Sequence, residues 1–161
     1  MRQDRFLIGI LIFIALLVIA ALVLFFVRQD VQTYGPEDTP EGVIRNYAIA
    51  LQKRDFERAY TYLADKENKP EFDAFRRTFI THQLDVTGTA LKIGSVEYTS
   101  DDEAMVQVSV IYAASGPFAE SRGSSEYATL VRQNGEWRLI YMPYPYWAWD
   151  WYQPPVEPVR P

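Results

Sequence analysis

Few side chains in this sequence are able to perform acid–base or nucleophilic chemistry. It contains one histidine, His82, and no cysteine, which excludes thiol nucleophiles and makes a transition-metal site improbable on composition. Asp85 follows His82 at a distance of three residues, and Arg138 offers a guanidinium group for an anion. A histidine in this position is usually a core or helix-end residue, an aspartate three residues away usually forms a local pair with it, and an arginine on a strand usually lies on an exposed sheet face. We therefore predict no catalytic residue, metal or cofactor, and retain His82, Asp85 and Arg138 only as weak polar candidates.

The aromatic residues near the C-terminus form a more unusual group. Three of the four tryptophans fall within residues 147–151, and an indole buries up to about 250 Å², or about 4–6 kcal/mol gross. Leaving three of them in water would forgo an amount comparable with the net stability of a domain, about 5–15 kcal/mol. We expect them to cover the domain itself, lipid headgroups, or a partner or flat ligand such as a glycan. The predicted ligand or partner surface consists of Tyr144, Tyr146, Trp147, Trp149 and Trp151.

The local conformation of this segment decides how the three indoles are presented. In an extended chain, Trp147, Trp149 and Trp151 would lie on one side, because side chains alternate with a period of two. In a helical turn, Trp147 and Trp151 would share a face and Trp149 would lie roughly opposite. The sequence leaves both arrangements open.

Residues 6–27, "FLIGILIFIALLVIAALVLFFV", contain no charged side chain. As a helix they would be about 33 Å long, enough for a hydrocarbon core of about 30 Å. The apolar region of a cleaved signal peptide is shorter, about 7–15 residues, and precedes a small-residue cleavage site. We therefore predict an uncleaved transmembrane helix over residues 6–27, with the lipid bilayer as its partner.

The charges around this segment predict its orientation and the environment of the rest of the chain. Arg2 and Arg5 precede the apolar stretch and Arg28 alone follows it, so the positive-inside rule places residues 1–5 in the cytoplasm and the C-terminal domain outside. This predicts a single-pass signal anchor in the cell membrane, and an exported domain without cysteine is ordinary in a bacterial cell envelope. The net charge of −5 argues against nucleic acid as a partner. Residues 28–38, with Gly35-Pro36, are predicted to be a linker.

The elements that must position these side chains are helices first and strands afterwards. Asp38 or Thr39 is a cap for a helix that starts near Pro40, Asp55 opens a short second helix, and Pro70 starts a third. Apolar residues then recur at spacings of three and four along the first and third helices, namely Val43, Ile44, Tyr47, Ala48 and Leu51, and Phe72, Phe75 and Phe79. A regular third helix would place His82 at the end of its apolar stripe.

After Gly88 the apolar period changes to two, which indicates strands. Four are predicted, over about 91–98, 104–112, 127–131 and 137–141, with an irregularity at Gly94-Ser95 in the first. Asn134-Gly135 is a strong signal for a tight hairpin between the last two, across which Arg132 and Arg138 could face each other. The fold class is therefore α+β, with about three helices packed on a mostly antiparallel four-stranded sheet.

Two stretches resemble the nuclear transport factor 2-like superfamily. "TPEGVIRNYAIALQKRDFERAYTYL" (39–63) is similar to its opening helical pair, and "EYATLVRQNGEWRLI" (126–140) to its closing hairpin. The resemblance covers residues 39–152 and leaves 153–161 as a Pro-rich tail. It implies a curved sheet wrapped around a helix to form a cone with an internal pocket. Isomerases, cyclases, dehydratases and non-catalytic binding domains share this scaffold, so the resemblance does not decide function.

The function predicted from the sequence is a membrane-anchored, extracytoplasmic binding or assembly module without catalytic activity. One alternative is a small cyclase or isomerase with its active site inside the cone, and another is an accessory subunit of a cell-envelope complex. The expected partners are the lipid bilayer through residues 6–27, a protein partner or a second copy of the chain in a homodimer, and a small apolar or flat ligand.

Overall fold

The structure is a computed structural model and describes residues 2–27, 33–113 and 122–154, with side chains in the first range from 7 to 23 only. The chain divides into two compact units, Met1–Thr33 and Tyr34–Pro161. Each unit is described by itself below. The predicted Pro-rich tail lies outside the described residues from 155 onward, as does the predicted linker over residues 28–32.

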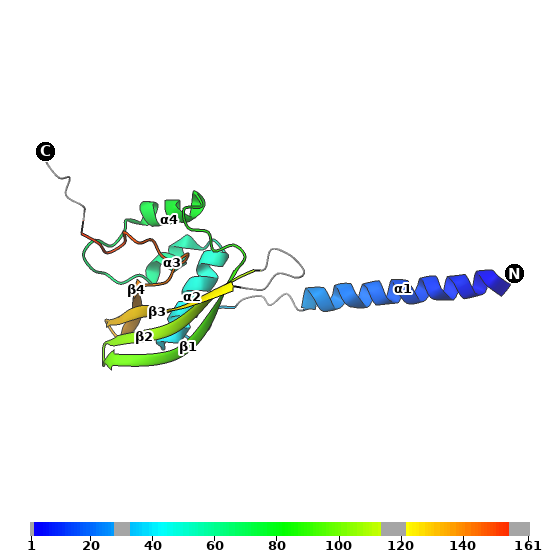
Figure 1. The fold of residues 1–161 in the computed structure, drawn as a ribbon, viewed down its shortest axis with the longest axis horizontal. Coiled ribbons are helices and arrows are strands. Elements are labelled where there is room, and N and C mark those ends of the chain that lie inside the picture. Colours follow the sequence, from blue (N-terminus) through cyan, green and yellow to red (C-terminus); the bar gives the residue numbers. More distant parts are fainter. Residues whose placement is uncertain (1, 28–32, 114–121, 155–161) are drawn as a thin grey trace. The chain divides into compact units, whose positions relative to one another are not determined.

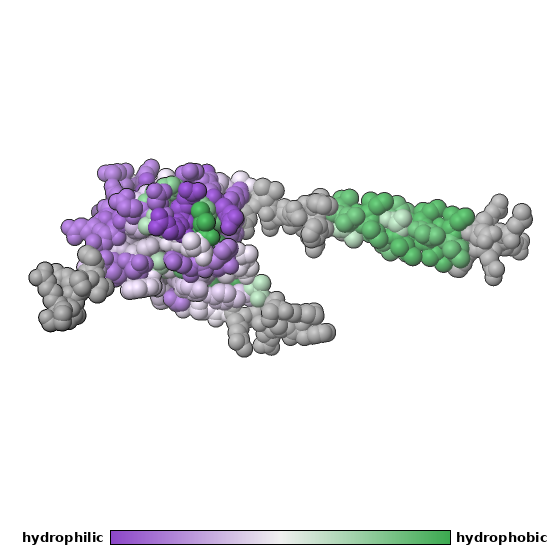
Figure 2. All heavy atoms as spheres, turned by 90° about the horizontal axis from the view of Figure 1, so that it is seen from above, coloured by the Kyte–Doolittle hydropathy of each residue, from purple (hydrophilic) through white to green (hydrophobic). Residues whose placement is uncertain are grey.

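The first unit is a single helix, α1, Arg2–Val27. Its large apolar side chains between Leu7 and Val23 are exposed, and in Figure 2 they form a continuous hydrophobic surface. Within the described part of the chain, no helix has the length and hydropathy needed to cross a membrane. This finding does not support the transmembrane helix predicted over 6–27.

In its described residues, the second unit has three helices followed by a four-stranded antiparallel sheet in the order β1-β2-β3-β4, which confirms the predicted α+β class. The helices lie on one side of the sheet, and the segment after β4 returns beside α3 and α4 (Figure 1). The elements are α2 Pro40–Gln52, α3 Phe56–Thr61, α4 Phe72–Ile80, β1 Thr89–Ser100, β2 Glu103–Tyr112, β3 Arg122–Gln133 and β4 Glu136–Tyr141.

The helix starts follow from local capping. Thr39 Oγ1 accepts a hydrogen bond from the Gly42 amide at 3.1 Å, and Pro40 takes the first helical position, where its missing N–H is not needed. Asp55 caps α3 in the same way by accepting from the Arg58 amide at 3.2 Å. The first two predicted helices are therefore confirmed at their capping residues.

The sheet contains the predicted irregularity and the predicted turn. The β1–β2 register shifts between Ile93 and Val96, as expected from Gly94-Ser95. Asn134 and Gly135 both have positive φ, 53° and 84°, which a type I′ hairpin requires. β3 is longer than predicted, and its core-facing residues are Ala128 and Leu130. Short pairing of residues 62–64 with Leu139 covers the outer edge of β4.

The core lies between α2 and the sheet. The alternating residues Val106, Val108 and Val110 of β2 are fully buried, as are Ile44 and Tyr47 of α2. The apolar stripe of α2 and the two-residue period of β2 thus meet face to face. This packing leaves the short helices and the segment after β4 to close the remaining side of the core.

Candidate functional site

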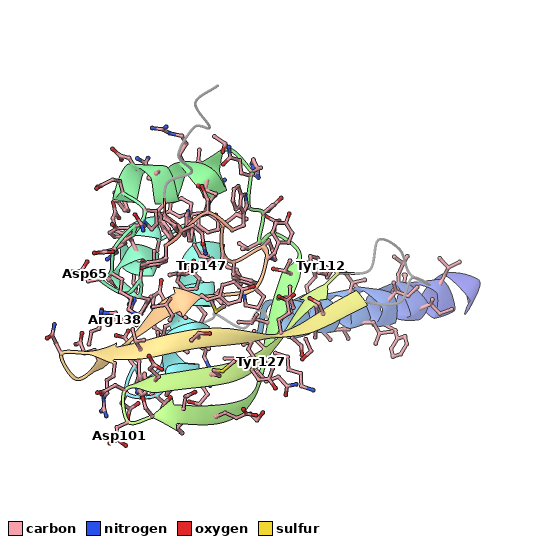
Figure 3. The ribbon with its side chains drawn as sticks, turned by 60° about the vertical axis from the view of Figure 1, so that its left-hand side comes forward. Asp65, Asp101, Tyr112, Tyr127, Arg138 and Trp147 are labelled. Atoms are coloured by element: carbon pink, nitrogen blue, oxygen red, sulfur yellow. The ribbon has the colours of Figure 1, made fainter. Side chains whose placement is uncertain are left out.

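The tryptophan-rich segment folds back onto its own domain. Trp147 and Trp151 are 4% and 6% exposed, and their rings meet edge to face with centroids 4.9 Å apart. Trp151 also packs on Phe75 and Phe79 of α4, at centroid distances of 5.1 and 6.1 Å. Of the three surfaces expected to cover the indoles, the domain itself therefore covers two of them, Trp147 and Trp151. In Figure 3, Trp147 lies among the helices on the side of the sheet that carries the core.

Hydrogen bonds fix the same segment to distant parts of the chain. The Tyr47 hydroxyl donates to the Tyr146 carbonyl at 2.7 Å, and the Tyr146 hydroxyl lies 2.9 Å from Thr89 Oγ1. The Tyr152 hydroxyl donates to the Ala64 carbonyl. Burial raises the pKa of Tyr47 and of Tyr146, because a tyrosinate would lose its hydration there. Both hydroxyls therefore stay neutral, and their hydrogen bonds hold the segment in place.

Two aromatic side chains of the segment remain in solvent. Trp149 is 82% exposed and Tyr144 is 59% exposed, whereas Tyr146, Trp147 and Trp151 are buried, contrary to the expectation that all five aromatic residues form a binding surface. The segment thus follows the helical alternative, with Trp147 and Trp151 together and Trp149 turned away. Trp149 is held on both sides by residues whose side chains are fixed in the core.

Trp149 and Tyr144 line an open pocket of about 490 Å³, which we call the aromatic groove. It lies between the end of α4 with the turn that follows and the segment after β4. Its lining residues are Thr78, Gln83, Leu84, Tyr141, Met142, Tyr144, Trp147, Ala148, Trp149 and Asp150.

Carboxylates are the charged groups of the aromatic groove. Asp150 is the one charged side chain among the described residues that line it. A second carboxylate, Glu126, lies next to the groove residue Tyr141. Burial, the charge of Glu126 and a hydrogen bond to it raise the pKa of Tyr141. Tyr112 lies close to Tyr144 and Glu126, and burial followed by these two neighbours raises its pKa as well.

Of the weak polar candidates, His82 and Asp85 lie next to each other and Arg138 lies on β4, and the position expected for His82 is wrong. The α4 helix ends at Ile80, so His82 lies beyond it with φ 56° and an exposed side chain, not in an apolar stripe. Its Nδ1 is 3.7 Å from the exposed carboxylate of Asp85, and hydrogen bonds from Thr87 lower the pKa of Asp85. This is a local surface pair.

Arg138 has ordinary partners on the sheet surface. Its guanidinium group is paired with Glu136 and donates to the Trp137 carbonyl at 3.2 Å. The expected approach of Arg132 to Arg138 is wrong, because the register places Arg132 opposite Trp137. The Arg132 guanidinium lies 5.5 Å from the Trp137 ring.

Aromatic rings fill the interior of the domain. Tyr47, Tyr62, Tyr146 and Phe75 are fully buried, and apart from the tyrosine hydroxyls Asn46 has the one polar side chain among the described residues that are buried as a whole. The same residues contain no cluster of histidine and carboxylate side chains able to hold a metal ion.

The polar network around residues Tyr34–Glu37, which we call the N-terminal strap, was not predicted. Asn46 pairs with Gly35 through both backbone groups, at 2.9 and 2.8 Å. Glu37 accepts from Tyr62 at 2.7 Å and from Arg58 at 2.8 Å, and the Arg58 guanidinium lies 3.5 Å from the Tyr34 ring. A polar amide within the buried run of α2 was the signal available in the sequence.

Comparison of the sequence with protein-family models and with curated proteins finds no match. Solved structures with a similar chain path include a SEC-C motif-containing protein from Rhodopseudomonas palustris, with 14% identity and TM-score 0.47 over 65% of this chain and 77% of the other. An NTF-2-like protein of unknown function from Shewanella oneidensis MR-1 has 10% identity and TM-score 0.45, over 60% and 88%.

A third similar structure is a ketosteroid isomerase-like protein from Erwinia carotovora atroseptica SCRI1043. It has 17% identity and TM-score 0.44, over 62% of this chain and 86% of the other. No conclusion about the activity of this chain follows from similarity at this level.

Proposed function

We propose that this chain is a membrane-anchored, extracytoplasmic binding module of the nuclear transport factor 2-like type, and that the aromatic groove is its binding site. The observation that carries the proposal is Trp149. Its indole is 82% exposed at the rim of a 490 Å³ pocket, while Trp147 and Trp151 hold the backbone on either side. An indole in water contributes nothing to the stability of the domain, but it is a strong contact for a ligand.

The composition of the core supports binding over catalysis. Isomerase and cyclase chemistry needs an acid or base in a water-excluded pocket, where its pKa is shifted toward neutrality. In the described part of the domain, Tyr47, Tyr62 and Phe75 occupy the interior, and Asn46 is the one other buried residue with a polar side chain. An amide does not exchange protons near neutral pH, and burial moves the pKa of Tyr47 and of Tyr62 further from neutrality.

The apolar N-terminal stretch supports the anchor. Residues 6–27 contain no charged side chain, and the described side chains of α1 are apolar and exposed. Exposed apolar surface of this kind is stable in a hydrocarbon environment and unfavourable in water. Arg2 and Arg5 before the stretch favour a cytoplasmic N-terminus.

The topology is tested by protease treatment of intact cells or spheroplasts that express the chain with an epitope at its C-terminus. We expect loss of the epitope without lysis. Protection of the epitope until the membrane is permeabilised would refute the extracytoplasmic location.

The binding site is tested by ¹⁹F NMR on the full-length chain, labelled with 5-fluorotryptophan and placed in nanodiscs. The four tryptophan resonances are assigned by Trp→Phe substitution, and a panel of envelope glycans, peptides and small organic molecules is titrated in. We expect a ligand to move the Trp149 resonance while that of Trp137, on β4, stays fixed. A panel that leaves Trp149 unmoved, or that moves Trp137 equally, would contradict a binding site in the groove.

A further inference from the structure

The charges around the aromatic groove restrict what it can bind. Its described lining contains the carboxylate of Asp150 and no lysine, arginine or histidine. Glu126 adds a second carboxylate beside Tyr141. A described lining with a carboxylate and no cation, and with a second carboxylate nearby, favours cationic over anionic ligands. The remaining polar lining groups, Thr78 and Gln83, are neutral.

The aromatic residues of the lining also favour cationic ligands. The faces of tryptophan and tyrosine rings carry negative electrostatic potential, and tryptophan is the strongest partner for ammonium and guanidinium groups. Tyr141, Tyr144 and Trp149 all contribute to the groove and are all exposed to solvent. A cation that carries alkyl groups can therefore contact ring faces and remain close to a carboxylate.

The backbone around Trp149 reduces the cost of such binding. Trp147 is packed on Tyr152, with ring centroids 5.7 Å apart and nearly parallel, and Trp151 is packed on Phe75. The chain on both sides of Trp149 is thus fixed before a ligand arrives. A pre-positioned side chain loses little freedom on binding, so more of its contact energy contributes to affinity.

We infer that the aromatic groove recognises an organic cation, an alkylammonium or guanidinium group, through the rings of Trp149 and its neighbouring tyrosines and the carboxylate of Asp150. This inference rests on the proposed binding function and specifies the ligand class of that site. Such a group is presented by small quaternary amines and by lysine and arginine side chains of peptides.

The test compares choline with 3,3-dimethylbutan-1-ol, which has nearly the same shape and no charge. Both are titrated at low ionic strength into the 5-fluorotryptophan-labelled full-length chain in nanodiscs, with the Trp149 resonance as the readout. We expect choline to bind about tenfold or more tightly than the neutral compound. N-acetyl-lysine and N-acetyl-arginine methylamides form further arms, and a stronger response to them identifies peptide side chains as the source of the cation.

The role of the carboxylate is tested with Asp150→Asn. We expect choline affinity to fall about two- to fivefold at low salt, with a smaller difference at high salt, and the affinity of the neutral compound to stay the same. Asp101→Asn is the matched control, because Asp101 is an exposed carboxylate in the β1–β2 turn, away from the groove (Figure 3). Unchanged Trp147 and Trp151 resonances establish that each variant remains folded.

Each outcome decides the inference. Equal binding of choline and its neutral counterpart, or equal effects of Asp150→Asn and Asp101→Asn, would overturn the choice of a cation and leave the groove as a binding site. A Trp149 resonance that responds to other compounds of the panel and to none of the cations would also overturn the choice of a cation, and the groove would remain a binding site. A Trp149 resonance that responds to no compound at all would overturn the proposed function as well.

Discussion

The placement of the indoles predicts that Trp151→Ala and Trp149→Ala have very different effects on stability, although the chemical change is identical. Trp151 is 6% exposed and packs on Phe75, Phe79 and Trp147. An indole of up to about 250 Å², at about 25 cal/mol per Å², sets an upper bound near 6 kcal/mol. Substitution of a buried Phe or Trp by Ala costs about 3–5 kcal/mol. We therefore expect Trp151→Ala to lower the free energy of unfolding by about 4 kcal/mol.

Trp149 is the matched control within the same segment. Its side chain is 82% exposed, so Trp149→Ala should change the free energy of unfolding by less than about 0.5 kcal/mol. The measurement is urea unfolding of residues 31–161, which contain the compact unit Tyr34–Pro161 and its core. Far-UV circular dichroism is the probe, because it does not depend on tryptophan emission. A domain of this size should also lose about 15 °C in Tm for Trp151→Ala.

Two results would refute the reasoning. Equal losses for the two substitutions would mean that Trp149 and Trp151 share one environment, as in an extended segment on a common surface. A loss below about 1 kcal/mol for Trp151→Ala would mean that the segment after β4 is not part of the core.

Three further substitutions test other contacts. Tyr47→Phe leaves the buried Tyr146 carbonyl without its donor and should cost about 1–3 kcal/mol, seen as a lower urea midpoint with unchanged slope; a cost under 0.5 kcal/mol would contradict that hydrogen bond. A hydrogen bond from Tyr62, followed by the interaction with Arg58, lowers the pKa of Glu37. The ionised Glu37 side chain therefore stabilises the folded state fully at pH values above the carboxyl pKa of the unfolded chain, and this stabilisation is lost as the pH falls through the lower pKa of the folded state. Glu37→Gln should therefore flatten the stability profile below about pH 5, and identical profiles would exclude this role. Gly42→Ala would place Cβ 2.2 Å from the Pro36 carbonyl oxygen, which should displace the strap and speed its proteolysis, whereas unchanged cleavage would show that the strap is not held there.

The sequence predicts the elements of this fold well where the signals are local. Thr39, Pro40 and Asp55 mark helix starts through hydrogen bonds within one turn, and Asn134-Gly135 specifies a hairpin by its own backbone preferences. These caps and this turn depend on neighbouring residues only, so they can be predicted from the sequence alone.

Helix ends are less predictable, as α4 demonstrates. Its apolar period continues toward His82, yet the amides of Gln83 and Leu84 both turn back to the Thr78 carbonyl. His82 then takes the left-handed conformation that often ends a helix. The periodicity of side chains does not report where the backbone changes its hydrogen-bond partners.

The candidate site depends on contacts between distant residues, which the sequence could not specify. It indicated that the indoles must cover a surface, but the choice of surface depends on Tyr47 and Phe75, far away along the chain. Trp149 could be separated from its two neighbours only once the backbone turn between them was known. The acidic character of the groove likewise arises because β3 brings Glu126 near Tyr141 of β4 and the segment after β4 brings Asp150 to the groove.

The N-terminal strap has a practical consequence for anyone who trims this protein. A fragment that begins at Pro40, the first residue of α2, would retain every helix and strand of the second unit. It would nevertheless leave the Asn46 amide, 0% exposed in the intact chain, without Gly35, and it would remove the carboxylate that Arg58 and Tyr62 share. A buried polar group without a partner costs about 1–3 kcal/mol. Expression boundaries should therefore be set before Tyr34, because instability of a fragment that begins at Pro40 would reflect the loss of the N-terminal strap and not a defect of the fold.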